Sequence, residues 1–255
     1  MFPEIILTVV IAAFVLEFFD SAVGMGFGTL TPVLILLGFA PLAVVPAVLF
    51  CSAALSLSSG IMHHGMKNFD FFRKENRKIF CIFLGFGLVA IILGAFIAVN
   101  IPEYALDIYI GLLTLAIGLI ILKKFKMRRK VSLKRITAFA TLASANKGIT
   151  GGGFGPVLSG GQIISGIKSK RAVGMTQITE GTLSIIGVLA HMVFQPGQTL
   201  EWSIIVSMLL GGILSVPIAV YLVRRIDSRK IRLTMGLVSI VLGIAVILKV
   251  ILARF

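Results

Sequence analysis

Two glycine-rich segments share a pattern that suits a backbone anion site. The sequence Gly-Met-Gly-Phe-Gly at 24–28 recurs as Gly-Gly-Gly-Phe-Gly at 151–155, an offset of 127 residues. Glycine permits positive φ angles and close approach of backbones. If a helix begins near Phe27 and another near Phe154, their unpaired N–H groups and positive dipole ends attract an anion. Glycines that only allow tight helix packing are the alternative, and two matched clusters favour the binding role.

The charged residues Glu17, Asp20, Lys147 and Glu180 lie within expected membrane segments. A charged side chain at the centre of a membrane costs about 2.5–3.5 kcal/mol on insertion scales, so each is a functional candidate. The offset of 127 places Asp20 and Lys147 at equivalent positions in the two segments. They either form a structural ion pair, or Lys147 binds an anion while Asp20 helps to switch it, and the sequence leaves both open.

A polar stripe surrounds the last of these charges. Thr176, Thr179 and Glu180 fall on one helix face at spacings of three and four, with Gln177 beside them. The stripe either lines a cavity, with Glu180 as a proton acceptor, or bonds to neighbouring helices, and the carboxylate favours the cavity. The candidate coupling or gating residues are Glu17, Asp20, Gln177 and Glu180. The candidate substrate-binding residues are Gly24, Gly26, Phe27, Gly28, Asn146, Lys147, Gly151, Gly152, Gly153, Phe154 and Gly155.

Other reactive side chains carry weaker signals. His63 and His191 lie near the ends of apolar runs, where interfacial anchoring is the favoured role, and Cys51 and Cys81 are expected to be small core residues. The sequence contains no metalloprotease, nucleophile-elbow or phosphate-loop motif. We therefore expect no catalytic residue, no metal site and no cofactor.

The composition places these residues in a membrane. Of 255 residues, 58% are hydrophobic and 13% charged, against about 45–50% and about 25% in soluble domains. Residues 79–99 and 202–223 are uncharged, and about 20 apolar residues suffice to span a bilayer. A soluble enzyme, a disordered chain and a disulfide scaffold are excluded. The sequence predicts an all-α, polytopic integral membrane protein.

The repeat divides the chain into two halves, residues 1–127 and 128–255. Each half is expected to contain two short apolar arms, too short to cross a core about 30 Å thick, and then three spans. Two short arms that meet at glycines predict a re-entrant hairpin. The expected arms are 5–19 with 27–39 and 136–146 with 154–167; the expected spans are 42–62, 79–99, 104–122, 172–194, 202–223 and 233–248.

The positive charges support this topology. Of 24 Lys and Arg residues, 21 fall in the segments 67–78, 123–135, 168–171 and 224–232. With both hairpins re-entrant, all four segments lie on one face, which the positive-inside rule makes cytoplasmic. This clustering between apolar runs also argues against a nucleic-acid partner, despite the net charge of +14. Three crossings per half invert the second half relative to the first, an arrangement typical of secondary transporters that bind substrate at the repeat interface.

The chain resembles the sulfite exporter family of TauE/SafE type over nearly its whole length. The resemblance rests on 24–28 followed by Pro32, on Asn146-Lys147-Gly148 leading into 151–156, and on the two-half layout. Pro32 has no counterpart at the equivalent position, where Ser159 stands, so the second hairpin is expected to differ in shape. The resemblance implies a cell-membrane transporter of sulfite, sulfonates or related sulfur-containing or organic anions. The expected partners are a small anion and the lipid bilayer, and Glu180 makes protons candidate coupling ions. A passive anion channel and a membrane-embedded enzyme are the alternatives.

Overall fold

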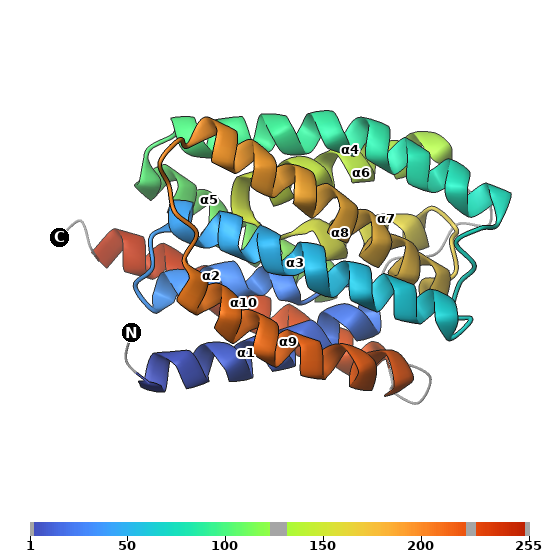
Figure 1. The fold of residues 1–255 in the computed structure, drawn as a ribbon, viewed down its shortest axis with the longest axis horizontal. Helices are drawn as coiled ribbons and strands as arrows, with labels where there is room; N and C mark the ends of the chain where they lie inside the picture. Colours follow the sequence, from blue (N-terminus) through green and yellow to red (C-terminus); the bar gives the residue numbers. More distant parts are fainter. Residues whose placement is uncertain (1–2, 123–131, 223–227, 253–255) are drawn as a thin grey trace.

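The computed structural model describes residues 3–122, 132–222 and 228–252, and within these ranges every regular element is a helix (Figure 1). The elements are α1 (Pro3–Val23), the 3₁₀ turn η1 (Phe27–Thr29), α2 (Leu30–Leu36), α3 (Pro41–Gly65), α4 (Lys74–Asn100), α5 (Glu103–Leu122), α6 (Leu133–Thr150), α7 (Phe154–Ile164), α8 (Ser169–Phe194), α9 (Trp202–Leu222) and α10 (Ser228–Leu252). The protein is an all-α polytopic membrane protein, as its composition predicts.

Seven of these helices are long and apolar enough to cross a membrane. Six of them, α3, α4, α5, α8, α9 and α10, coincide with the six expected spans, with ends that differ by a few residues. The seventh is α1, which is 21 residues long. The expectation that this segment is a short arm ending at residue 19 is therefore wrong about its length.

Buried polar side chains explain the extra length of α1 and α6. The expected arms end at Phe19 and Asn146, yet α1 continues through Asp20 to Val23 and α6 continues through Lys147 to Thr150. In the folded chain these two charged side chains have hydrogen-bond partners on other elements. Because tertiary contacts satisfy the charges, the helices continue past them.

The turns that follow α1 and α6 have the same backbone conformation. Gly24 and Gly151 have φ angles of 72° and 70°, in the left-handed region that ends many helices and that glycine adopts without strain. The returning helices α2 and α7 end alike, since Gly38 and Gly166 have φ angles of 99° and 101°. The sequence repeat is thus also a repeat of local backbone geometry.

Helix packing follows the same correspondence. α1 packs mainly against α9 and α6 mainly against α4, while α3 packs against α8 and α5 against α10. Glycines bring the backbones of α5 and α10 together, because a Cβ at Gly118 would lie 2.7 Å from the carbonyl oxygen of Gly236 and one at Gly243 2.8 Å from that of Gly111. In each contact the partners come from different halves of the chain.

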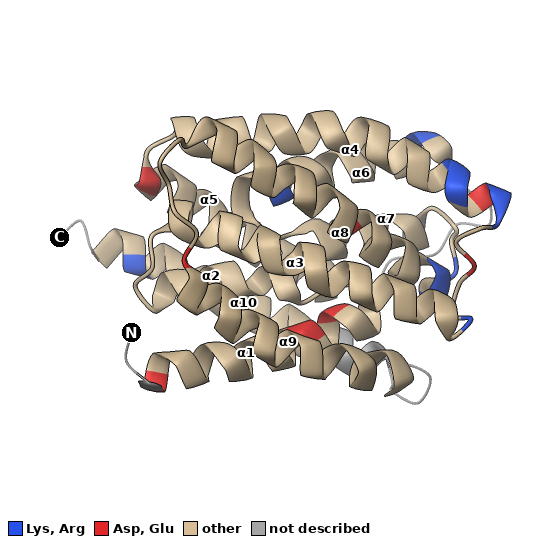
Figure 2. Ribbon diagram, viewed as in Figure 1, with Lys and Arg blue, Asp and Glu red and all other residues tan. Residues whose placement is uncertain are grey.

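Charge is segregated along the long axis of the molecule. Figure 2 shows most Lys and Arg residues gathered at one end of the helices, where the loop before α4, the start of α6 and the loop before α8 lie. The parts of the basic segments 123–135 and 224–232 that fall at 123–131 and 224–227 lie outside the described residues. α1 begins and α10 ends at the opposite end (Figure 1). One end of the molecule is therefore strongly basic.

Candidate functional site

The two glycine turns, 24–28 and 151–155, meet at backbone contact. A Cβ at Gly28 would lie 2.5 Å from the Cα of Gly152 and 2.9 Å from the nitrogen of Gly153, closer than real Cβ atoms come. Gly155 in turn faces the carbonyl of Gly24. The glycines are needed because any side chain here would push the two turns apart.

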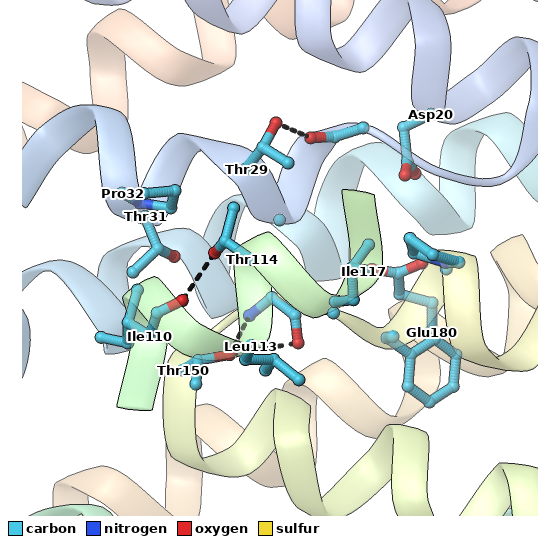
Figure 3. Close-up of a pocket in the computed structure, with 17 residues that line it drawn as sticks. Asp20, Thr29, Thr31, Pro32, Ile110, Leu113, Thr114, Ile117, Thr150 and Glu180 are labelled. Atoms are coloured by element: carbon cyan, nitrogen blue, oxygen red, sulfur yellow. Dashed lines mark hydrogen bonds between the residues drawn. The ribbon is translucent and has the colours of Figure 1, made fainter. Parts of the chain in front are cut away.

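A cavity lies beside this contact, and we call it the central cavity. Its lining comes from the two turns and the helix ends beside them, from one face of α5 and from single residues of α1 and α8 (Figure 3). The lining residues are Asp20, Gly26, Gly28, Thr29, Thr31, Pro32, Ile110, Leu113, Thr114, Ile117, Thr150, Gly152, Gly153, Phe154, Gly155, Pro156 and Glu180. The space open to the centres of water-sized spheres is about 20 Å³, slightly more than the roughly 10–15 Å³ that one water needs.

Lys147 is completely buried and its ammonium is fully engaged. Its Nζ donates to Glu180 Oε1 at 2.7 Å, to Ser52 Oγ at 3.2 Å and to the carbonyl of Gly151 at 3.4 Å. The Phe154 ring lies 5.9 Å from the same nitrogen. The ion pair thus joins α6 to α8, and the alternative in which Lys147 pairs with Asp20 is wrong.

Asp20 caps the turn that follows it. Its Oδ1 accepts from the backbone N–H of Phe27 at 3.3 Å, and its Oδ2 accepts from Gln177 Nε2 at 2.8 Å. The first hairpin therefore holds the protein's own carboxylate at the start of η1, the place expected for an external anion.

Two further candidates have specific partners. Glu17 is buried, and its Oε1 accepts from Ser21 Oγ at 2.6 Å while its Oε2 has no partner. Asn146 Oδ1 accepts from Tyr109 Oη at 2.6 Å and so joins α6 to α5. Neither residue lines the central cavity, so neither contacts its contents in this conformation.

Residues of the polar stripe on α8 have two different roles: one lines the cavity, and others form hydrogen bonds away from it. Glu180 lines the cavity, and its Oε2 has no hydrogen-bond partner. Thr176 instead accepts from Gln162 Nε2 at 2.8 Å, and Thr179 donates to the carbonyl of Met175 at 2.8 Å. Of the four stripe residues, the carboxylate alone faces the cavity.

Sequence reasoning missed the contribution of α5. Thr114 lines the cavity and donates to the carbonyl of Ile110 at 2.7 Å (Figure 3). The available signal was a threonine inside the uncharged run 108–122. Thr31 was missed as well, although its buried hydroxyl has no partner and lines the same space.

The prolines of the two hairpins occupy different positions. Pro32 is the third residue of α2 and Pro156 the third residue of α7, and both line the cavity. The three-residue turn η1 precedes α2 and has no counterpart before α7. Pro32 therefore lies three residues further from Gly24 than Pro156 lies from Gly151, and the two hairpins differ in shape at this point.

His63 and His191 are buried, so their expected role as interfacial anchors is wrong. His63 Nε2 bonds to the carbonyl of Ser21 at 2.7 Å, and His191 Nε2 bonds to the carbonyl of Gly148 at 2.8 Å. Each carbonyl belongs to the last turn of a helix that ends at a glycine turn, where carbonyls lack intrahelical partners. The histidines thus fix equivalent points of the two hairpins.

Comparisons with known proteins agree with this architecture. The family model described as sulfite exporter TauE/SafE matches residues 9–246. A relative from Bacillus subtilis (strain 168), the "Probable membrane transporter protein YtnM", is 22% identical over 231 residues, which cover 86% of this chain and 75% of the relative. No solved structure matches the chain. Because the family model covers nearly the whole sequence, this membrane protein belongs to the sulfite exporter TauE/SafE family of transporters.

Proposed function

We propose that the chain is a secondary transporter of a small anion: sulfite, a sulfonate or a related sulfur-containing or organic anion. The observation that carries the proposal is the central cavity, which lies where the glycine turns of residues 1–127 and 128–255 meet. Secondary transporters with inverted repeats bind their substrates at such an interface, between broken helices. The start of α7 supplies N–H groups, and Lys147 supplies a buried positive charge.

Alternating access fits the geometry of the cavity. The cavity holds about one water, so an anion with several oxygen atoms requires the two glycine turns to separate. The equivalent backbone conformations of the two hairpins allow the two halves to exchange roles as the site opens first to one side and then to the other. Rocking of one repeat against the other would supply this movement.

The contacts of the buried polar groups favour transport over catalysis. An enzyme in this fold would use a buried histidine as a base, but His63 and His191 both engage backbone carbonyls through Nε2. The acidic residues of the cavity are likewise bonded to groups that hold the hairpins in place. We therefore infer that the chain is not an enzyme and that the buried polar groups serve binding and movement.

Counterflow in proteoliposomes tests the proposal. Purified protein is reconstituted, and uptake of labelled sulfite or ethanesulfonate is measured with and without the same unlabelled anion inside. A carrier gives saturable uptake that internal anion accelerates, because the loaded site returns faster than the empty one. Uptake that does not saturate, and whose rate does not change with unlabelled anion inside the vesicle, would identify a passive channel instead. Empty liposomes and liposomes with boiled protein are the controls.

A further inference from the structure

Glu180 separates the central cavity from the only buried lysine of the described chain. Glu180 is among the residues that line the cavity, whereas Lys147 is not. Its Oε1 contacts the Lys147 ammonium at 2.7 Å, and its Oε2 has no hydrogen-bond partner. A solute in the cavity therefore reaches the carboxylate first. The positive charge expected to hold the anion is already covered by an anionic group of the protein.

The charge around this pair disfavours an additional anion. α1 brings Glu17 and Asp20 within electrostatic range of Glu180 and Lys147. α3 contributes the uncharged Ser52 to the lysine, and the titratable residues on its buried face are Cys51 and His63. Residues 82–100 of α4 and all of α7 contain no titratable side chain, and α6 contributes Lys147 itself. With every carboxyl group ionised, three negative charges surround one positive charge.

We propose that Glu180 is an internal substitute for the transported anion, and that a proton admits the substrate by releasing Glu180 from Lys147. The inference rests on the proposed anion transport and specifies how the same site is regulated. A proton from the solution on the open side of the cavity binds the Glu180 carboxylate. The neutral acid loses most of its attraction to the ammonium, and the substrate anion takes its place beside Lys147 and the first N–H groups of α7.

The proton remains on Glu180 during the crossing and leaves on the other side. When the anion departs, Lys147 again lacks a counter-charge, and the buried ammonium favours return of the ionised carboxylate. The proton is then released to the solution, so one proton accompanies each anion. A monoanion crosses with no net transfer of charge. Glu180 is a lining residue of the cavity, and its unpartnered Oε2 would be the atom that takes up and releases the proton.

The pH dependence of ethanesulfonate binding tests the inference, because a sulfonate stays ionised over the mildly acidic to mildly alkaline range. Binding to the reconstituted full chain is expected to weaken as pH rises, since Glu180 then competes in its ionised form. Glu180→Gln mimics the protonated acid, so this variant should bind at least about tenfold more tightly than wild type at alkaline pH, with affinity independent of pH. It should keep counterflow exchange but lose anion accumulation driven by a proton gradient.

A matched control and a second variant separate the possible outcomes. Glu103→Gln removes an exposed carboxylate and should keep the wild-type pH dependence. If Glu180→Gln misfolds, the double variant Glu180→Gln with Lys147→Met removes both charges of the pair, and it should fold but bind no ethanesulfonate at any pH. The inference would be overturned if ethanesulfonate affinity in Glu180→Gln had the same pH dependence as in wild type, or if the double variant bound ethanesulfonate. Absence of saturable sulfite or ethanesulfonate flux in wild type would overturn the proposed function itself.

Discussion

Lys147 is surrounded by groups from four elements, and their chemistry defines its role. The ammonium contacts a carboxylate on α8, a hydroxyl on α3 and a carbonyl in the second glycine turn, and it lies near the ring at the start of α7. In a low-dielectric interior such a pair is costly to form and more costly to break, because the remaining charge has no solvent. The pair therefore fixes the second hairpin as long as both charges are present.

Removal of one partner of this pair should destabilise the protein. Lys147→Met leaves Glu180 buried without its counter-charge, and we expect a loss of about 3–5 kcal/mol in unfolding free energy. Thermal unfolding in detergent, followed by tryptophan fluorescence of Trp202, measures the change. The double variant Lys147→Met with Glu180→Gln should recover most of the stability without recovering anion binding. Equal stability of the single variant and wild type would refute the role of the pair.

At the scale of elements, the two hairpins share structural features at equivalent positions. Each has a glycine with positive φ at the end of its first helix and a histidine that bonds to a carbonyl of the first helix. They differ at Asp20 and Lys147, where opposite charges occupy equivalent positions. The shared glycines and histidines position the hairpins, and the opposite charges give the two hairpins different roles.

The glycine contact between the turns predicts a position-specific effect of a single methyl group. Gly28→Ala places a Cβ 2.5 Å from the Cα of Gly152, so the turns must separate, and we expect at least a tenfold loss of counterflow rate, about 1.4 kcal/mol. Gly160→Ala is the matched control, because no atom lies within 4 Å of a Cβ at that site. Rates of the two reconstituted variants are compared at equal protein. An unimpaired Gly28→Ala would show that close approach of the turns is not needed.

The buried histidines should have similar energetic effects in the two halves. His63→Ala and His191→Ala each leave a helix-end carbonyl without its partner, at Ser21 and Gly148. Loss of the hydrogen bond to such a buried group costs about 1–3 kcal/mol, and truncation of the ring adds a cavity. Ser58→Ala, which removes an exposed hydroxyl on α3, is the control. Thermal unfolding of the three variants measures the effect; a negligible change in either histidine variant would contradict it.

At the scale of the whole molecule, the distribution of charge predicts orientation. The basic end contains the loops before α4 and α8, and the opposite end contains the connections between α4 and α5 and between α8 and α9. We infer that the basic end faces the cytoplasm, since cytoplasmic loops of membrane proteins are enriched in Lys and Arg. Both ends of the described chain, at the start of α1 and the end of α10, would then face outward (Figure 1).

Cysteine labelling in intact cells checks this orientation. In a background with Cys51→Ala and Cys81→Ser, single cysteines replace Glu103, Gln198, Lys74 or Lys170, which are all exposed. An impermeant maleimide should label the first two in intact cells and the last two only after permeabilisation. Labelling of Lys74→Cys from outside would show that the protein has the opposite orientation in the membrane. Labelling of Lys74→Cys and Lys170→Cys from opposite sides would exclude the inverted repeat.

The sequence alone determined the architecture and the region of the site. Long apolar runs have few stable arrangements other than membrane helices, because backbone polar groups in lipid must bond within the segment. The six spans could therefore be predicted from the apolar runs. The family and the two glycine clusters that meet beside the cavity could be predicted from the repeated glycine motifs. The spans follow from local composition, and the glycine clusters are found by comparing residues 1–127 with residues 128–255.

The tertiary structure decided which buried groups are partners. Symmetry of the sequence placed Asp20 opposite Lys147, but folding brings Glu180 of α8 to the lysine and Gln177 to the aspartate. Residues separated by 33 and 157 positions meet in these contacts, and no periodic pattern encodes such distances. The partner of a buried charge depends on how helices pack in three dimensions. For that reason the sequence identified the charges, whereas only the fold showed that a carboxylate occupies the place expected for the anion.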